Sequence, residues 1–462
     1  MSYISKLCGN TPTFWFDSIG SKFPSNFNYF CLRAQPAFIG SLIPSLIYLI
    51  IRIMHGSIIS ALVAAAMMLF ETSIIVESRI IATDAFLFFF ISLSIFFGKS
   101  QTLQKYPSFS FYLFMFLTAF SLGFSLATKL TSVATVFAIA ILQLLDLYKR
   151  HFSKKTNYKL LIKDITIRIL IFIITILVIY LTAFFFHFNL LPFESRDDEY
   201  IPFEYKPKDL IQKNTFENQL QSSKKFRPFY FLYKVWKVNK DMYKANMAIN
   251  EKHSYSSPWY SWPLHFGKPV LYWIKYDSTN ISKIESIYCI GNIIVWWLVF
   301  TGVVVYVFML IIFHFILRRH KKKIEKKILD HSQKITKIKN EVFYHKFDYL
   351  QDNLLLHFDS LCFLLAGYLF NLFIFFPISR PTWLYHYIPS LIFGILLFSL
   401  LLDILIRVYF PDLIWKFLIV SILIFWTFLS FVFFIPFIYA FPLNPFQFNE
   451  RIFFSFWKPK KI

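Results

Sequence analysis

The feature that most constrains this chain is the succession of long apolar runs along nearly its whole length of 462 residues. Each run approaches the roughly 20 residues that an α-helix needs to cross the hydrocarbon core of a bilayer. The runs are too long and continuous for the strands of a membrane barrel, so they predict helices and an all-α, polytopic membrane protein. The expected spans are ten, at residues 34–54, 57–75, 80–98, 109–127, 131–147, 168–190, 288–317, 356–377, 386–408 and 413–440.

Basic residues gather between these runs. Six Lys or Arg lie between Lys149 and Lys163, and eleven lie between Arg318 and Lys346, in a chain of net charge +22. Clusters of this kind beside spans are typical of cytoplasmic loops that obey the positive-inside rule. The charge therefore predicts orientation in a membrane, and we expect no nucleic-acid partner.

Alternation of the spans then assigns a side to every other loop. The predicted organisation is a non-cytoplasmic N-terminal segment (1–33), an N-terminal membrane half with six spans (34–190), a long non-cytoplasmic loop (191–287), a C-terminal membrane half with four spans and a basic cytoplasmic loop at 318–355 (288–440), and a non-cytoplasmic tail (441–462).

Short turns on the non-cytoplasmic face carry cationic or imidazole side chains at the membrane edge. These are Arg79, Lys129, Arg380 and His386. Positive residues are disfavoured on that face, so the set requires a reason. One interpretation is snorkelling or ion pairing, for example of Arg79 with Asp84 or Glu77. The other is a convergent anion-binding site at the outer membrane interface.

The long loop contains three recognisable segments. RPFYFLYKVWKVNKDMYKANMAI predicts an amphipathic helix, because its aromatic residues keep rough helical spacing. HSYSSPWYSWPL, at 253–264, cannot form a regular helix across two prolines five residues apart. Asn280, in the sequence Asn-Ile-Ser, is a candidate N-glycosylation site.

Motifs for other chemistries are missing from the sequence. There is no nucleotide-phosphate loop, no H-E-x-x-H and no G-x-S-x-G. The four cysteines are scattered and predict neither a zinc site nor a disulfide framework, and we expect no metal and no cofactor. Ionisable residues concentrate at one membrane interface, which favours a site acting on a lipid-borne substrate over a conduction path through the midplane.

Six stretches follow one another in an order typical of one family. They are FDSIGSKFPSNFNYFCLRAQPAFIGSLIPSLIYLI, ESRIIATDAFLFFF, GFSLATKLTSV, VWKVNKDMYKANMAINEKHSYSSPWYSWPL, YCIGNIIVWW and RPTWLYHYIPS. From about residue 14 to the end, the chain resembles the protein O-mannosyltransferases, membrane enzymes of the GT-C glycosyltransferase class. Ser78, Arg79 and Asp84 match the family's S-R-x-x-x-x-D helix start, Lys129 its short turn with a lysine, and His386-Tyr387 its L-x-H-Y-x-P turn.

The resemblance implies a GT-C-type helix bundle that transfers mannose from dolichyl-phosphate-mannose to Ser/Thr hydroxyls of proteins, at the lumenal face of the endoplasmic reticulum membrane. A lipid phosphate leaves in this reaction, so it requires positive groups rather than a general acid. The implied phosphate-binding residues are Arg79, Lys129, Arg380 and His386. A dimer with itself or with a related mannosyltransferase is the implied assembly. Residues expected to be structural or beside the substrates are Asp84, His253, Tyr255, Trp259, Trp262 and Tyr387.

Two departures from the family pattern bear on activity. The family's first span and the Asp-Glu pair that follows it, which would hold the catalytic base, are missing from this sequence, and so is the carbohydrate-binding-like MIR domain. No residue is therefore assigned as the base. Three hypotheses follow: a mannosyltransferase whose sequence lacks its true start, a catalytically inactive member that partners an active relative, and an unrelated membrane transporter.

Overall fold

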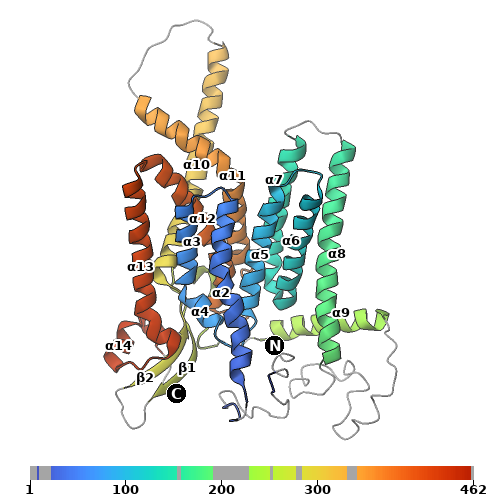
Figure 1. The fold of residues 1–462 in the computed structure, drawn as a ribbon, viewed down its shortest axis with the longest axis vertical. Helices are drawn as coiled ribbons and strands as arrows, with labels where there is room; N and C mark the ends of the chain where they lie inside the picture. The colour runs from blue at the N-terminus through green and yellow to red at the C-terminus, as the bar shows by residue number, and fades with distance from the viewer. Residues whose placement is uncertain are drawn as a thin grey trace.

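The computed structural model describes residues 8–9, 22–25, 27–152, 158–190, 228–249, 253–276, 283–329 and 341–458. Over these residues the chain forms a bundle of long, roughly parallel and antiparallel helices with one small sheet (Figure 1). The long helices are α2 (Tyr29–Ile53), α5 (Asp84–Thr102), α6 (Phe109–Thr128), α7 (Val133–Leu147), α8 (Tyr158–Leu190), α9 (Pro228–Ala248), α10 (Ile293–Leu329), α11 (Glu341–Phe373), α12 (Ile388–Tyr409) and α13 (Leu413–Tyr439). The shorter helices are α3 (Ile58–Leu69), α4 (Thr72–Glu77) and α14 (Pro445–Glu450).

Nine helices of the described chain are long and apolar enough to cross a membrane, and they confirm nine of the ten predicted spans. The tenth prediction, at 57–75, is not a single continuous helix, although its residues bring the chain back to the end of the bundle where α5 starts (Figure 1). Its residues form α3, which is 12 residues long, and the separate α4 of 6 residues. At 1.5 Å per residue, α3 covers roughly 18 Å, well short of the roughly 30 Å of a bilayer core.

The break between α3 and α4 comes from a capping interaction that apolar periodicity does not reveal. Glu71 precedes α4, and its carboxylate accepts a hydrogen bond from the backbone N–H of Ser73 at 3.2 Å. A carboxylate at a helix N-terminus satisfies free N–H groups and interacts favourably with the helix dipole. A new helix therefore starts at Thr72 although the surrounding residues are apolar.

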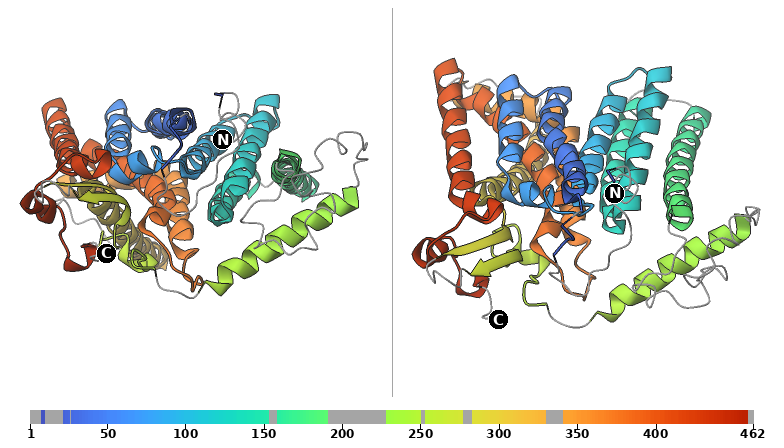
Figure 2. Two further views of the ribbon diagram at one scale, coloured as in Figure 1. Left: turned by 90° about the horizontal axis from the view of Figure 1, so that it is seen from below. Right: turned by 60° about the horizontal axis from the view of Figure 1, so that its bottom comes forward.

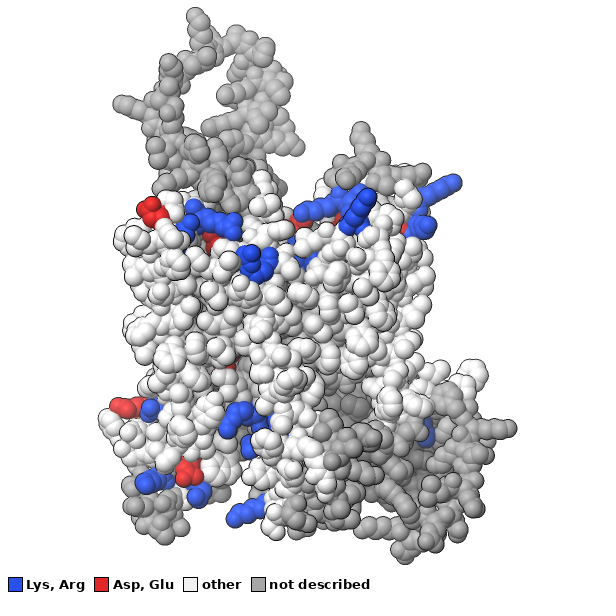
Figure 3. Space-filling view, viewed as in Figure 1, with Lys and Arg blue, Asp and Glu red and all other residues white. Residues whose placement is uncertain are grey.

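The bundle has two distinct ends. We call the end that carries the strands, α4, α9 and α14 the sheet end, and the end where α2, α5 and α12 finish the basic end (Figure 1). In Figure 3, Lys and Arg lie near both ends of the face shown, and the band between them is free of their colour. The predicted amphipathic helix is present as α9, which runs across the foot of α8 and away from the bundle (Figure 2).

The sheet consists of two antiparallel strands, β1 (Val270–Tyr276) and β2 (Ile284–Cys289). Val270 pairs with Cys289 and Tyr276 with Ile284, with a bulge between Leu271 and Trp273. The sequence analysis did not predict this hairpin. It is stabilised from outside, because Leu443 forms a bridge with the first residue of β2 and aromatic residues of α13 and the C-terminal segment pack against the same strand.

Cys8 and Cys31 form a disulfide, with their Cα atoms 6.5 Å apart. The expectation that the scattered cysteines take part in no disulfide is therefore wrong for this pair. A spacing of 23 residues carries no recognisable motif, and only the fold brings the two residues together. Cys289 and Cys362 are free.

Candidate functional site

The start of α5 and the turn after α6 meet at the sheet end through an ion pair. Lys129 Nζ lies 2.6 Å from Asp84 Oδ1, and the two side chains are 28% and 9% exposed. The same ammonium lies 5.0 Å from the centroid of the Tyr385 ring. Lys129 is thus held between a carboxylate and an aromatic face, both of which favour a cation.

Arg380 and His386 extend this cluster from the segment that precedes α12. Lys129 and Arg380 both lie within electrostatic range of the His386 ring. Arg380 is half-buried and has no hydrogen bond or ion pair with any residue that the structure describes. Three of the four side chains predicted to bind phosphate therefore converge, and among the described residues nothing engages the guanidinium donors of Arg380.

The geometry of His386 defines how it can interact. Its Nδ1 accepts a hydrogen bond of 3.0 Å from the backbone N–H of Trp383. In the neutral imidazole the ring proton is then on Nε2, which can donate to an acceptor. His386 is only 8% exposed, so a ligand would meet an edge of the ring rather than its face.

Arg79 is directed elsewhere. Its Nη1 donates a hydrogen bond of 2.6 Å to the carbonyl of Ile438, and its guanidinium stacks 4.3 Å from the centroid of the Tyr439 ring. The suggestion that Arg79 pairs with Asp84 or Glu77 is therefore wrong: Asp84 pairs with Lys129. Arg79 instead caps the C-terminal end of α13, where carbonyl groups lack helical partners.

Glu77 joins the cluster as a buried carboxyl. It is 1% exposed, and its Oε1 accepts a hydrogen bond of 2.6 Å from the Tyr272 hydroxyl in β1. Burial and then the negative charge of Asp84 raise the pKa of Glu77 to about 7, against hydrogen bonds from Tyr272 and Cys289 that lower it. In the sequence, Glu77 is distinguished only by its place in the turn, because its hydrogen-bond partner Tyr272 lies 195 residues away.

The segment 253–264 packs directly against the turn that carries His386. Ser257 N–H donates to the carbonyl of Thr382 at 2.9 Å, and the Thr382 hydroxyl donates back to the carbonyl of Ser257 at 2.9 Å. Only a short 3₁₀ turn, Trp259–Ser261, forms within the segment, as its prolines predict. This reciprocal pair of bonds fixes the aromatic segment beside the cluster.

The aromatic residues of these two segments divide by exposure. Trp262 and Tyr387 are fully buried: the Trp262 indole N–H donates to the Ser257 hydroxyl at 3.0 Å, and the Tyr387 hydroxyl bonds to that of Tyr368 at 2.9 Å. Both are therefore packing residues. Trp259 is half-buried, with its ring 5.4 Å from that of Phe373.

His253 and Tyr255 lie at the outer edge of this aromatic segment. His253 is exposed and lies 5.9 Å, centroid to centroid, from Trp383, while Tyr255 is half-buried with the ammonium of Lys268 4.9 Å from its ring centroid. These two residues can reach a bound molecule, which Trp262 and Tyr387 cannot.

A second polar centre, formed by Asn292 and Glu71, links separate segments of the bundle through hydrogen bonds. The Asn292 side-chain amide donates to the carbonyls of Phe70 and Thr427, each at 2.9 Å. Its backbone N–H and the indole N–H of Trp296 both donate to Glu71 at 3.2 Å. The centre joins the break before α4, the start of α10 and the middle of α13. The YCIGNIIVWW stretch contains Asn292, but the sequence did not identify Glu71.

The predicted glycosylation site stays a prediction. Asn280 lies outside the described residues. In the part of the chain that the structure describes, no group of three His, Cys, Asp or Glu could hold a metal ion.

Comparison with known proteins gives concordant matches. Residues 1–192 match the family described as dolichyl-phosphate-mannose-protein mannosyltransferase, and residues 231–457 match the C-terminal four-span region of protein O-mannosyltransferase. The chain is 29% identical over 192 residues to dolichyl-phosphate-mannose–protein mannosyltransferase 5 of Candida albicans, covering 42% of this chain and 26% of that protein. It is 31% identical over 187 residues to protein O-mannosyl-transferase 2 of Danio rerio, covering 40% and 25%. The chain thus spans about a quarter of the length of the curated relatives it matches.

A solved structure shares the fold. The S. cerevisiae protein O-mannosyltransferase Pmt1-Pmt2 complex bound to the sugar donor matches 99% of this chain and 85% of its own chain, with a TM-score of 0.79 and 16% sequence identity. The nine spans, the sheet end and the polar cluster are thus arranged on a GT-C-type membrane fold. Since both halves of the chain match the same family and the fold agrees, this chain belongs to the protein O-mannosyltransferases.

Proposed function

We propose that this chain transfers mannose from dolichyl-phosphate-mannose to Ser/Thr hydroxyls of proteins. The observation that carries the proposal is the convergence of Lys129, Arg380 and His386 at one end of the bundle, beside the aromatic segment 253–264. Membership of the family supports the choice of donor and acceptor.

The reaction develops negative charge on the lipid phosphate as the bond to mannose breaks. Fixed positive groups and N–H donors that point to this phosphate stabilise the transition state, because they require no reorganisation when the charge appears. Arg380 supplies an uncommitted guanidinium, His386 supplies an Nε2–H donor, and Lys129 supplies an ammonium held by Asp84. Arg79 is left out of this set, because its guanidinium caps α13 through Ile438 and stacks on Tyr439.

The acceptor hydroxyl requires a base within hydrogen-bond reach. The two carboxyls of the cluster, Asp84 and Glu77, are both buried and bonded, to Lys129 and Tyr272 respectively. Neither is placed to meet an acceptor hydroxyl, so we assign the role of base to neither.

We further propose that the sheet end faces the lumen of the endoplasmic reticulum and that the protein works with a second family member. The basic stretches 149–163 and 318–346 support this orientation through the positive-inside rule. The yeast structure that shares the fold is a complex of two such proteins, which supports a related partner.

Replacement of Arg380 tests the phosphate role with little structural disturbance, because this side chain forms no hydrogen bond or ion pair with any described residue. In microsomes that contain the chain together with its relatives, Arg380→Ala should lower mannose transfer to a Ser/Thr peptide about a hundredfold, as removal of one transition-state donor does. Lys283→Ala is the matched control, since it removes an exposed cation from the same end of the bundle. Equal turnover of the two variants would exclude the proposed phosphate site.

A further inference from the structure

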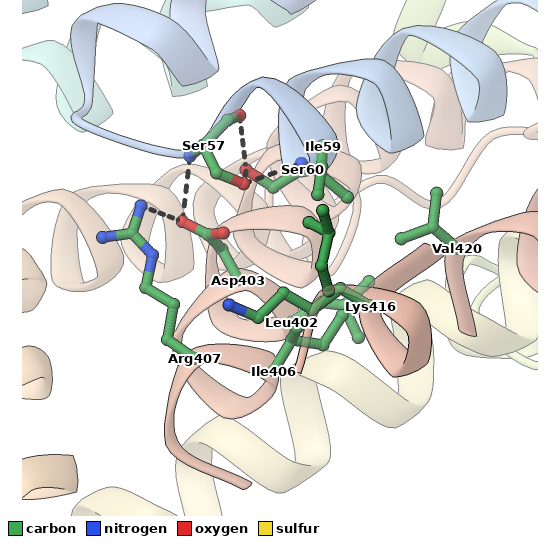
Figure 4. A pocket seen from close by; sticks show the side chains of 10 residues that line it. Ser57, Ile59, Ser60, Leu402, Asp403, Ile406, Arg407, Lys416 and Val420 are labelled. Carbon is green, nitrogen blue, oxygen red and sulfur yellow. Dashed lines mark hydrogen bonds and ion pairs between the residues drawn. The ribbon is translucent and has the colours of Figure 1, made fainter. Parts of the chain in front are cut away.

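A small cavity with both charged and apolar side chains in its lining is at the basic end, far along the bundle from the site described above. It has a volume of about 190 Å³ and is enclosed by the start of α3, the end of α12 and the start of α13 (Figure 4). It is lined by Ser57, the N-cap of α3, by Ser60 of α3, by Asp403 and Arg407 of α12, and by Lys416 of α13. A cavity of this size and polarity could accommodate a small charged group.

The charges within the cavity are only partly paired. Asp403 Oδ2 accepts a hydrogen bond from the Ser57 N–H at 3.0 Å and pairs with Arg407 Nη2 at 2.7 Å. Lys416 is half-buried and forms no ion pair with any residue that the structure describes. One carboxylate against two cations leaves one net positive charge, which is complementary to a single anionic group.

Directly below this cavity, toward the middle of the bundle, an open groove of about 550 Å³ is lined almost entirely by apolar atoms of α2, α3 and α13. The two hollows have lining residues on the same two helices, α3 and α13. Ile59 of the cavity and Leu62 of the groove are three residues apart on α3, and Val420 and Ile424 are four residues apart on α13. Such spacings put each pair on one helix face within one turn.

The combination fits an amphiphile whose anionic group lies at the membrane edge and whose apolar chain runs into the bilayer. The side chains that flank the groove face outward, since Leu62 and Leu69 are about half exposed, at 50% and 54%. Small residues, Ala65 and Ala66, form the groove floor and leave room for a hydrocarbon chain.

We propose that this cavity and groove bind one phospholipid, with its phosphate beside Lys416 and one acyl chain between α2, α3 and α13. The site lies on the membrane face opposite the proposed mannosyl transfer, so it does not depend on that function. Its expected effect is to hold the short helix α3 against α13 at the basic end.

The test uses the full chain, purified in mild detergent, delipidated and titrated with dioleoyl phosphatidylglycerol under native mass spectrometry. Lys416→Gln should weaken lipid binding about tenfold through loss of the charged contact. Ala66→Phe fills the groove without changing any charge and should also weaken it. Lys105→Gln, which removes an exposed lysine from the basic end outside the cavity, is the matched control and should bind as the unaltered chain does.

A parallel titration with glycerol 3-phosphate distinguishes a lipid from a free phosphate. Weak binding of this soluble probe, together with loss of phosphatidylglycerol binding in both site variants, supports the proposal. Equal binding of the soluble probe, with no effect of Ala66→Phe, would show a site for phosphate alone and overturn it. Binding by Lys416→Gln equal to that of Lys105→Gln would also overturn it, and this result is independent of whether Ala66→Phe folds.

Discussion

Replacement of Asn292 by Ala should destabilise the protein strongly, because three separate segments depend on this side chain. Its amide donates to the buried carbonyls of Phe70 and Thr427, and its Oδ1 accepts from the N–H groups of Ile294 and Val295 at the start of α10. Each lost buried bond contributes about 1 kcal/mol, and loss of a helix N-cap contributes about 1 kcal/mol. The expected loss in free energy of unfolding is therefore about 3 kcal/mol.

The assay is thermal unfolding of the purified chain in one detergent, followed by tryptophan fluorescence, to which the buried Trp296 beside Asn292 contributes. A loss of about 3 kcal/mol corresponds to a decrease in Tm of about 3 °C for a chain of this size. The control is Asn246→Ala, because the exposed Asn246 amide makes one local bond, of 2.7 Å, to the carbonyl of Met242. Its effect should be within about 0.5 kcal/mol.

Equal shifts for the two variants would refute the reasoning. That result would mean that α3, α10 and α13 are held together by apolar contacts alone and that the polar centre at Asn292 and Glu71 adds no net stability. The cost of burying these polar groups can offset the gain from their hydrogen bonds, so either result would show whether the centre adds net stability.

Two further predictions concern the cluster and its support. Because folding raises the pKa of Glu77 from 4.5 to about 7, the contribution of Glu77 to the free energy of unfolding is greatest below pH 4.5 and falls by up to about 3 kcal/mol as the pH rises to about 7. Glu77→Gln should therefore flatten the dependence of Tm on pH between 4.5 and 7. Parallel curves for the two proteins would contradict this assignment. Thr382→Val removes the buried hydroxyl that donates to Ser257 and should lower the free energy of unfolding by about 1 kcal/mol, with a matching decrease in Tm. The control, Ser256→Ala, removes an exposed hydroxyl from the segment 253–264 and should lower the Tm by less. Equal Tm values for the two variants would show that the hydrogen bond between Thr382 and Ser257 adds no stability.

The sequence located the helices well because membrane spans are encoded locally. A run of about 20 apolar residues predicts a span whatever surrounds it. Alternation of such spans also predicted that Lys129, Arg380 and His386 lie at one end, since each is in a turn on the same predicted face. These predictions required no knowledge of which helix packs against which.

The remaining features depend on partners that are distant in the sequence. Arg79 bonds to Ile438, 359 residues away, and Glu71 bonds to Asn292, 221 residues away. Neither side chain carries a local signal that distinguishes an ion pair from a helix cap. The β1–β2 hairpin was missed for the same reason, because Leu443 and the C-terminal aromatic residues that stabilise it lie far from both strands.

The charges of the cluster bear directly on the proposed chemistry. Lys129 and Arg380 oppose Asp84, and the raised pKa of Glu77, about 7, keeps it mostly protonated well below pH 7, where these four groups carry one net positive charge. A lipid phosphodiester carries one negative charge, and this match would suffice to hold the donor. The phosphate gains further negative charge as mannose leaves, toward the roughly −1.5 to −2 of a phosphate monoester. Asp84 prevents Lys129 from meeting that increase alone, so the additional stabilisation falls to Arg380 and to the Nε2–H of His386. Under the proposed mechanism, Arg380 and His386 therefore stabilise the transition state more than they stabilise the bound donor.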